Sequence, residues 1–335
     1  MRPWLVARPR GGADELIVIT RGPGLSCPPH VPRHAMKQPE AEELLSCLPA
    51  GRTLFTYGKD WYAISLLRMK LHHTGFSELK HSSMANLLAK PRVRSWLGML
   101  GKKSVAPADL AMLYPEDAET SRLTTGLFSG WCQTSRRTNL AWNIVLQLNL
   151  NEDDARLMDK QFPVRDDDPF ERYCHPVHRG RHRTLAWARI DLDWITGEAL
   201  IEEIQNDRLR EVRRAVERIR RNNLAEVPIY GENVSATFIL NYWEKRLRIS
   251  RQCWDEAMLS AAIGFIANEL GIRRIYYHSP LSRAKLKRDG AADAPSSLYT
   301  DLPRKFCFER TTDLPAFLKR RRRTGDGLWM HRLVL

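Results

Sequence analysis

The chain has 335 residues, the length of about two average domains, and its 43% hydrophobic and 27% charged residues are ordinary globular usage. This composition excludes a disulfide-stapled miniprotein and a chain disordered throughout. Lys and Arg number 53 against 39 Asp and Glu, a formal net charge of +14 that favours polyanions such as nucleic acid, acyl-carrier phosphates or anionic lipid headgroups.

Signals for membrane insertion, for secretion and for a cysteine-based zinc ribbon are absent from the sequence. No apolar run reaches the roughly 18 residues of a membrane span, and the N-terminus lacks the apolar core of a secretory signal. We therefore expect a cytoplasmic protein with no membrane partner. The six cysteines contain no CxxC pair, which argues against a zinc ribbon and against a disulfide framework.

Residues 1–35 are rich in Arg, Pro and Gly and have no sustained periodicity. Such a segment buries too little apolar area to order itself, so we expect it to be disordered. A second methionine, Met36, precedes a segment with Pro39 and three acids, the pattern of a first helical turn. Our hypothesis is that Met36 is the natural start and that 1–35 is a misassigned extension. A basic nucleic-acid-binding arm is the alternative.

Residues 36–135 are predicted to form a mainly helical N-terminal region. Apolar residues recur near period 3.6 over 61–71 and 93–100, and Gly75 and Gly101 follow where a helix C-cap favours glycine. One short strand is expected at 53–57.

Residues 136–318 read as an α/β domain, and 319–335 as a basic C-terminal tail that begins with five consecutive Lys and Arg residues. Asn151 is a predicted N-cap, with three acids in the turn after it. The acidic run 166–168 reads as a surface loop. The expected strands are 143–150, 184–192, 199–205 and 272–278, and the expected helices are 151–161, 208–222 and 254–270. The strands 184–192 and 199–205 form an expected antiparallel hairpin whose turn contains Thr196 and Gly197. We predict a mixed, largely antiparallel sheet flanked by helices.

The most unusual stretch is Gly197–Asp207, which contains Glu202 and Glu203. Because a strand alternates faces, one of these carboxylates must lie on an apolar face. A carboxylate held there is paired, hydrogen-bonded or shifted in pKa, and such groups are common at functional sites. An edge strand with one wet face, or a Glu paired with an arginine, is the structural alternative.

Cys174, His175, His178 and His182 place four potential metal ligands within nine residues. Pro176 and Gly180 break any helix that would align them, and the spacing matches no structural zinc pattern, so we predict no metal site. We expect instead that His175 lies near the Glu202/Glu203 strand as an acid–base partner.

The helix at 208–222 carries seven arginines, with Leu209, Val212, Val216 and Ile219 on its expected inner face. The outer face is a candidate nucleic-acid site, which would be blind to sequence because no aromatic residue lies among the charges. A solvated helix with salt bridges to acids elsewhere is the alternative. The candidate nucleic-acid-binding residues are Arg210, Arg213, Arg214, Arg218 and Arg221.

The order of elements over 143–278, followed by the segment Ser297–Phe308 with its Leu-Tyr pair, resembles the GNAT acyltransferase superfamily. Separately, the segment 201–207, IEEIQND, resembles the IEEIQSDW segment of a domain found in large polyvalent proteins of phages and mobile elements. Asn206 and Arg208 stand where that segment has Ser and Trp. The combined resemblance covers roughly residues 140–318.

The resemblance implies a GNAT-like sheet and a set of roles. Tyr299 would protonate the leaving thiolate, and Glu202 or Glu203 would deprotonate an amine; a core aromatic is the alternative for Tyr299. The family holds the acetyl-CoA pyrophosphate with a glycine-rich loop at a helix start, but 248–254 contains no glycine. The positive charges of Arg248 and Arg251 would instead bind the phosphates. The candidate cofactor-binding residues are Arg248, Ser250, Arg251 and Gln205.

Two functions from different classes follow. The first is a divergent acyltransferase-type protein that uses a phosphate-bearing cosubstrate, with acyl-CoA as a candidate, on an unknown nucleophile. The second is a non-catalytic nucleic-acid-binding protein associated with phages or mobile elements.

Overall fold

The computed structural model describes residues 36–48, 53–129, 135, 142–162, 168–172, 175–177, 182–229, 231–287, 295–321 and 327–335, and the backbone at 5–6 and 17–18. Apart from those two backbone segments, the expectations for residues 1–35 and for Asp166 and Asp167 lie outside the described residues, as do Cys174 and His178. Asp168, the third acid of the expected surface loop, is a correction, because it is 6% exposed and forms ion pairs with Arg183 and Arg208. Two short strands, β1 (Leu5–Val6) and β2 (Ile17–Val18), pair antiparallel.

An eight-stranded mixed sheet is the centre of the fold, in the order β11-β12-β10-β7-β6-β5-β4-β3. Every neighbouring pair is antiparallel except β7 and β10, which run parallel. The predicted fold class, an α/β protein with a largely antiparallel sheet flanked by helices, is confirmed. The strands are β3 (Thr53–Tyr57), β4 (Glu119–Phe128), β5 (Asn143–Asn149), β6 (Thr184–Asp193), β7 (Glu198–Gln205), β10 (Arg274–His278), β11 (Glu309–Thr311) and β12 (Met330–Val334).

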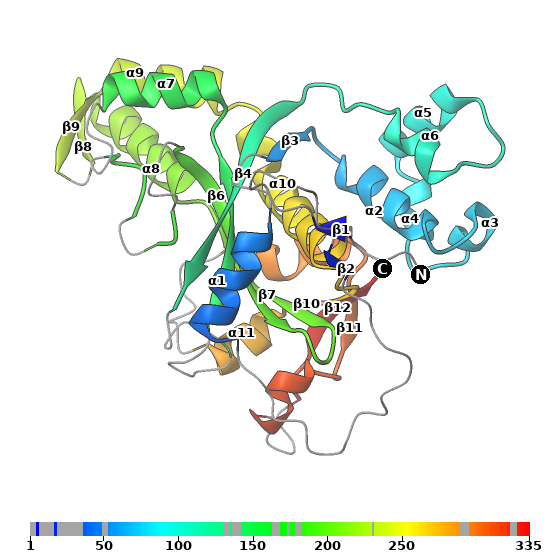
Figure 1. Ribbon diagram of the computed structural model, residues 1–335. Helices are drawn as coiled ribbons and strands as arrows, with labels where there is room; N and C mark the ends of the chain where they lie inside the picture. The colour runs from blue at the N-terminus through cyan, green and yellow to red at the C-terminus, as the bar shows by residue number, and fades with distance from the viewer. Residues whose placement is uncertain are drawn as a thin grey trace, which may run out of the picture.

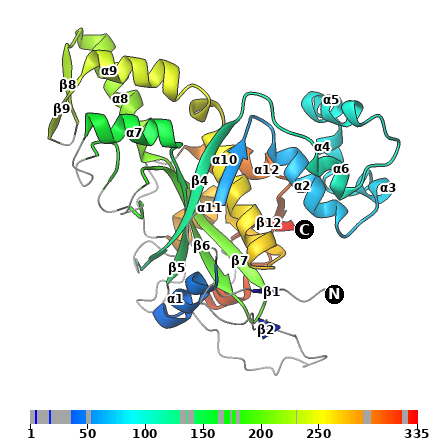
Figure 2. The ribbon, with the colours of Figure 1, turned by 45° about the horizontal axis from the view of Figure 1, so that its top comes forward.

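Helices surround this sheet in two groups and one central element (Figures 1 and 2). The first group is α2 (Tyr62–Leu71), α3 (Phe76–Leu79), α4 (Ala85–Leu88), α5 (Pro91–Leu100) and α6 (Pro107–Ala111). The second, the arginine-rich lobe, is α7 (Glu152–Gln161), α8 (Asp207–Asn222), α9 (Ala236–Asn241) and the hairpin β8 (Glu226–Ile229) and β9 (Glu232–Ser235). The central helix is α10 (Ser250–Gly264). The remaining helices are α1 (Gln38–Cys47), α11 (Pro280–Leu286), α12 (Asp301–Lys305), the π-helices Tyr242–Arg246 and Phe265–Glu269, and the 3-10 helices Ser296–Tyr299 and Ala316–Arg321.

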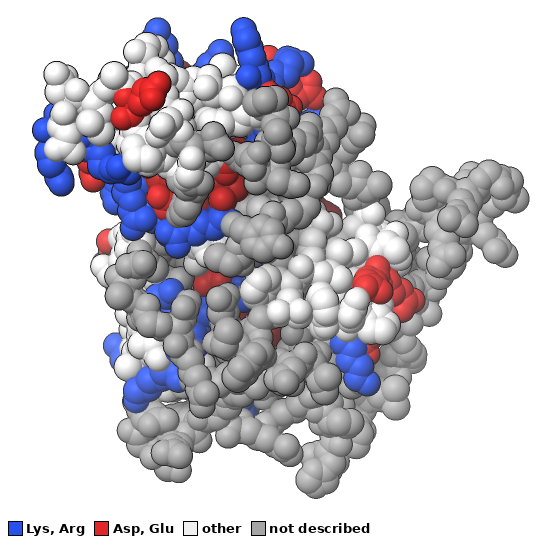
Figure 3. Space-filling view, turned by 90° about the vertical axis from the view of Figure 1, so that its left-hand side faces the viewer, with Lys and Arg blue, Asp and Glu red and all other residues white. Residues whose placement is uncertain are grey.

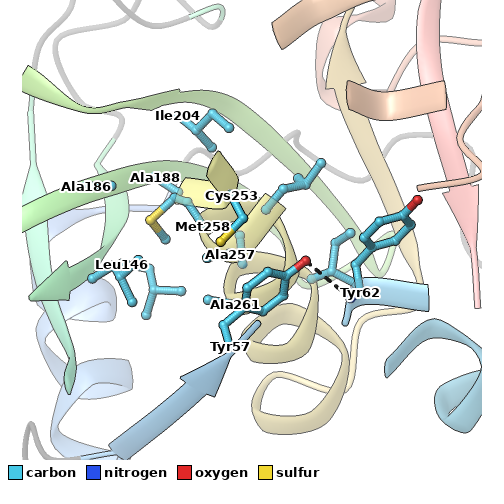
Figure 4. Packing of buried hydrophobic residues seen from close by; sticks show 14 of the residues in the cluster. Tyr57, Tyr62, Leu146, Ala186, Ala188, Ile204, Cys253, Ala257, Met258 and Ala261 are labelled. Carbon is cyan, nitrogen blue, oxygen red and sulfur yellow. Dashed lines mark hydrogen bonds between the residues drawn. The ribbon is translucent and has the colours of Figure 1, made fainter. Parts of the chain in front are cut away.

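The core lies between α10 and one face of the sheet, which we call the core face. Met258 and the small residues Ala257 and Ala261 of α10 pack against the strands, where Ala186 and Ala188 give the helix room (Figure 4). Alternate strand residues point to the other face, which we call the polar face. Cross-strand pairing aligns Thr124, Gln147, Trp187 and Gln205 there, from β4 to β7.

Local sequence signals placed most helix boundaries correctly. Asn151 caps α7 by accepting a hydrogen bond from the backbone N–H of Asp154, and Gly101 ends α5 at φ +61°. Gly75 is a correction, because α2 ends at Leu71 and Gly75 is instead the N-cap of α3, with an extended backbone. The expected helix start at Trp254 coincides with a break in α10, where Cys253 has non-helical dihedral angles.

The sheet runs through the expected boundary between residues 135 and 136. Strand β4 pairs with β5 from Arg122 and Asn149 to Phe128 and Asn143, so strands from both sides of the boundary form one sheet. Residues 330–334, expected in a basic tail, form β12 between β10 and β11. In the part of the chain that the structure describes, no helix is long and apolar enough to cross a membrane.

Candidate functional site

A β-bulge at Glu202 determines where the two acids of β7 point. Ile201 pairs with Ile190 and Glu203 pairs with Arg189, so Glu202 is the extra residue between two regular pairs. Such an insertion interrupts the alternation of side chains. Ile201 and Ile204 both belong to the core cluster, whereas both acids contact residues on the polar-face side. Strict alternation would have placed the two acids on opposite faces, and the bulge overturns that expectation.

Glu202 is fully buried, with 0% exposure, and accepts two hydrogen bonds from Ser135. The backbone N of Ser135 lies 2.9 Å from one carboxylate oxygen and its Oγ lies 2.8 Å from the other. His278 Nε2, at the end of β10, lies 3.3 Å from Glu202 Oε2 and 2.9 Å from Ser135 Oγ. Burial alone would raise the pKa of Glu202, but the hydrogen bond to His278 and nearby cations outweigh it and lower that pKa to about 2. Burial lowers the pKa of His278. Glu202 thus anchors residue 135 to the sheet.

Glu203 is 2% exposed and lies between two buried cations. It forms ion pairs with Arg189 of β6 and with Lys287 Nζ, the latter at 2.7 Å. Burial would raise the pKa of Glu203, but these two cations lower it to about 2. Glu202, Glu203, Arg189 and Lys287 form what we call the charged quartet, whose formal charges sum to zero. A carboxylate with a pKa near 2 remains ionised at neutral pH, which favours a counter-ion role over the base role that the resemblance implied.

The charged quartet lies where the parallel strands separate. Pairing of β7 with β10 ends at Ile201 and Tyr277, one residue before the first acid. The connection from β7 leads to α10 on the core face, whereas α11 follows β10 and packs, through Leu286, in a second cluster with Leu200 and Tyr276. In open α/β sheets, ligands usually bind at the carboxyl ends of neighbouring parallel strands whose connections leave toward opposite faces. Here the buried side chains of the charged quartet fill that position.

His175 forms a second polar unit at the end of β7. Its Nδ1 lies 2.5 Å from Asp207 Oδ2, and Asp207 is the first residue of α8. The imidazole packs edge-on against Trp187 at 5.4 Å, and Gln147 Nε2 holds the same loop by donating to the carbonyl of Pro176 at 2.8 Å. The His175 side chain is 17% exposed, and among described residues its Nε2 has no hydrogen-bond partner. The predicted neighbour of the Glu202/Glu203 strand therefore lies at its end, on Asp207.

Free hydrogen-bonding atoms surround this His175–Asp207 dyad. Trp187 Nε1, Gln205 Oε1 and Asn206 Nδ2 are buried and have no partner in the described part of the chain. Trp187 and Gln205 are directly opposed across β6 and β7. Buried polar groups are nearly always hydrogen-bonded, so a donor and an acceptor left open beside a histidine indicate a place for a polar ligand.

The predicted cofactor residues do not come together. Ser250 donates its hydroxyl to Glu119 Oε2 at 2.7 Å, and Arg251 stacks on Trp243 at 4.4 Å while it pairs with Glu244. Arg248 is exposed. These three residues lie at the start of α10 on the core face, whereas Gln205 lies beside the dyad on the polar face. The sheet separates the two groups.

Tyr299 is buried, with its ring stacked on Tyr277 at 5.6 Å and beneath the guanidinium of Arg283 at 5.0 Å. Burial raises its pKa above the ordinary value, so its hydroxyl keeps its proton at neutral pH. Both the proton-donor role and the core-aromatic alternative are compatible with this environment.

The arginines of α8 are mostly engaged. The predicted inner face of Leu209, Val212, Val216 and Ile219 is buried. Figure 3 shows Lys and Arg side chains on the arginine-rich lobe with acidic side chains among them. The partners are Asp207 and Glu211 for Arg210, Glu217 for Arg213, Glu211 for Arg214 and the carbonyl of Pro228 for Arg218, while Arg221 is exposed.

Sequence reasoning missed four members of the buried network: Ser135, Arg189, His278 and Lys287. Arg189 and His278 each stand among apolar residues of a strand, a pattern that marks a buried charge in need of a partner. Ser135 and Lys287 lie in segments without periodicity, and only the tertiary structure brings them to the sheet. No group of three potential metal ligands occurs among the described residues.

No protein-family model, no curated protein and no solved structure matches the chain.

Proposed function

We propose that this chain is an acyltransferase-type enzyme in which His175 accepts the proton of the attacking nucleophile. The observation that carries the proposal is the 2.5 Å contact of His175 Nδ1 with Asp207, with Nε2 left without a hydrogen-bond partner among the described residues. A buried carboxylate on one ring nitrogen orients the imidazole and stabilises the imidazolium that forms when the other nitrogen takes a proton. The charged quartet supports the strand end, and its two carboxylates, whose pKa values are lowered to about 2, stay ionised at neutral pH.

In this scheme an amine or hydroxyl group binds beside Trp187 and Gln205, whose free donor and acceptor atoms would position it. The nucleophile attacks the acyl carbonyl and a C–N or C–O bond forms while its proton moves to His175 Nε2. The bond from the carbonyl carbon to the leaving group then breaks, and the leaving group takes that proton from His175 as it departs. The resemblance adds a phosphate-bearing acyl donor. The start of α10 does not fit its phosphates, because the Glu119 carboxylate already holds the Ser250 hydroxyl there. We therefore derive no step through such a donor.

The test is acyl transfer by the full chain from acetyl-CoA and acetyl-pantetheine to a panel of amines and alcohols, followed as thiol release. His175→Gln should lower kcat by at least about 100-fold, the range of general base catalysis. Asp207→Asn should also lower kcat, because it removes the charge that stabilises the imidazolium. His73→Gln is the matched control, since His73 is an exposed histidine elsewhere on the surface. Full activity of His175→Gln, or no transfer to any acceptor, would overturn the proposal.

Polyanion binding by the outer face of α8 is the second candidate function. The exposure of Arg213, Arg214, Arg218 and Arg221 on one helix face favours it. We expect anisotropy titrations with labelled 20-nucleotide RNA to show affinity that falls steeply between 50 and 200 mM salt, as about 3–4 phosphate contacts would require. Replacing Arg213, Arg214 and Arg221 by alanine should flatten the salt dependence. Binding that survives this triple substitution with the same slope would exclude α8.

A further inference from the structure

Helix α8 and strand β8 lie side by side in the arginine-rich lobe (Figure 1). An open groove with a volume of about 250 Å³ lies between them, and we call it the α8–β8 groove. This volume is slightly below the roughly 300–1,000 Å³ of sites for drug-sized ligands, so it suits a smaller chemical group. The lining residues are Glu211, Arg214, Ala215, Arg218, Pro228 and Ile229.

Arginine side chains outnumber carboxylates at the α8–β8 groove. Glu211 is the one acid of the lining, and a single oxygen of its carboxylate accepts hydrogen bonds from three guanidinium groups. The donors are Arg172 at 3.2 Å, Arg210 at 3.4 Å and Arg214 at 3.2 Å from Oε1. Arg210 has a second partner in Asp207. One carboxylate balances one positive charge, so Glu211 compensates Arg214 only in part.

Arg218 adds a further positive charge one turn along α8. Its guanidinium donates to the carbonyl of Pro228 at 2.9 Å, and no carboxylate among the described residues forms an ion pair with it. A carbonyl oxygen orients a guanidinium group without neutralising its charge. The remaining N–H groups of Arg218 are therefore available to an anion, and guanidinium groups match the oxygen geometry of phosphate particularly well.

The apolar lining strengthens this attraction. Ala215 and Ile229 are buried and form a wall beside the two exposed arginines of the groove. Charges attract each other more strongly beside such a low-dielectric wall than in open water.

The α8–β8 groove also lies on the side of α8 that carries Asp207. Asp207, Glu211, Arg214 and Arg218 follow one another at spacings of four, three and four residues, which places them on one side of a helix. At a rise of 1.5 Å per residue, Arg214 lies about 10 Å and Arg218 about 16 Å from Asp207 along the helix axis. A ligand held in the groove would thus extend along α8 toward the His175–Asp207 dyad.

We propose that the α8–β8 groove binds a phosphate or diphosphate group of a small ligand between the guanidinium groups of Arg214 and Arg218. The lined part of α8, from Glu211 to Arg218, is about two turns long, which favours one or two phosphates over a nucleic-acid strand. The anion site rests on its own contacts. Its use for the phosphates of an acyl donor rests on the proposed acyl transfer.

The test is isothermal titration calorimetry of the full chain with inorganic pyrophosphate, at about 150 mM salt and without divalent cations. We expect saturable 1:1 binding, and at least about tenfold weaker binding by Arg218→Gln, because a charge-assisted hydrogen bond is lost. Arg220→Gln is the matched control and should bind normally, since Arg220 is an exposed arginine of α8 that pairs with Glu244 outside the groove. No saturable heat, unchanged affinity in Arg218→Gln, or equal losses in both variants would overturn the site.

Glu211→Gln supplies a second arm in which the expected change has the opposite sign. The substitution removes a carboxylate that competes for three guanidinium groups, so pyrophosphate should bind at least about threefold more tightly. Damage to the fold would weaken binding instead, and circular dichroism checks that the variant is folded. Unchanged or weaker binding by the folded variant would refute the groove as an anion site.

Competition with labelled RNA identifies the source of the phosphate. We expect saturating pyrophosphate, at constant ionic strength, to leave the anisotropy of the RNA unchanged, because the small ligand occupies the groove and any RNA lies on the outer face of α8. Displacement of RNA at the midpoint of pyrophosphate binding would assign the groove to a nucleic-acid backbone and overturn the small-ligand assignment. Pyrophosphate binding without acyl transfer would keep the anion site and exclude only its use for an acyl donor.

Discussion

Removing one charge from the charged quartet should destabilise the protein far more than removing an exposed charge. Glu203→Gln keeps the volume and an acceptor oxygen, so its effect reports charge and not a cavity. Arg189 and Lys287 both have fully buried side chains, and the substitution removes the carboxylate with which each of them forms an ion pair. Breaking a buried ion pair from one side costs about 3–5 kcal/mol, and we expect the free energy of unfolding to fall by that amount.

A second variant, Lys287→Met, tests whether lost charge balance causes the destabilisation of Glu203→Gln. Lys287→Met alone leaves an excess negative charge, but Glu203→Gln combined with Lys287→Met leaves one anion and one cation. We therefore expect the double variant to be less destabilised than the sum of the single variants, by about 1–3 kcal/mol. The measurement is urea denaturation at pH 7, followed by circular dichroism and tryptophan fluorescence. Glu217→Gln is the control, because its pair with Arg213 is exposed and should be worth less than about 1 kcal/mol.

Two results would refute this reasoning. A loss below about 1 kcal/mol in Glu203→Gln would mean that water or other groups already screen the two cations. Strictly additive losses in the double variant would mean that Glu203 and Lys287 do not act as one electrostatic unit.

Three further variants probe the elements that support the site. Asn206→Ala removes the N-cap bond to the backbone N–H of Leu209 and should cost about 1 kcal/mol in guanidinium denaturation, while Asn206→Asp should cost little. Met258→Ala opens a cavity beneath the sheet and should cost about 2–5 kcal/mol, against less than about 1.5 kcal/mol for Met258→Leu. Burial raises the pKa of Glu171 to about 7, above its ordinary 4.5, so the folded protein retains a proton that the unfolded chain releases between these values. Its contribution to the free energy of unfolding should fall by about 3 kcal/mol as pH rises through that window, and Glu171→Gln should flatten this slope in melts from pH 4.5 to 7.5.

Local patterns predicted the elements well because their causes are local. Asn151 as an N-cap and the apolar stripe of α8 depend on residues within one or two turns, and both hold in the structure. The sequence also predicts the strand 199–205. It cannot predict which face of the sheet each of its side chains occupies, because strict alternation assumes a regular strand. A bulge depends on the pairing partner, and the shift at Arg189 appears only once β6 and β7 are aligned.

The sequence predicts only part of the site, because local composition is visible in it and long-range contacts are not. Glu202, Glu203 and Asp207 lie in a short segment whose unusual composition is visible, but their partners come from far along the chain. Lys287 is 84 residues from Glu203, and Ser135 is 67 residues from Glu202. No spacing rule connects residues so distant. His175 is expected near the Glu202/Glu203 strand, and it lies at the end of that strand on Asp207, where Gln147 of β5 holds the loop that carries it.

The bulge also separates the roles of the two acids of β7. Were Glu202 absent, a regular strand would still place Glu203 opposite Arg189 and Gln205 opposite Trp187, because the register on both sides of the extra residue is intact. Glu202 is therefore not needed to aim the residues that follow it. What it adds is the contact to Ser135 and His278, which ties the β4–β5 connection and the end of β10 to one carboxylate. The inserted, fully hydrogen-bonded acid therefore links these segments without changing the register of the strand.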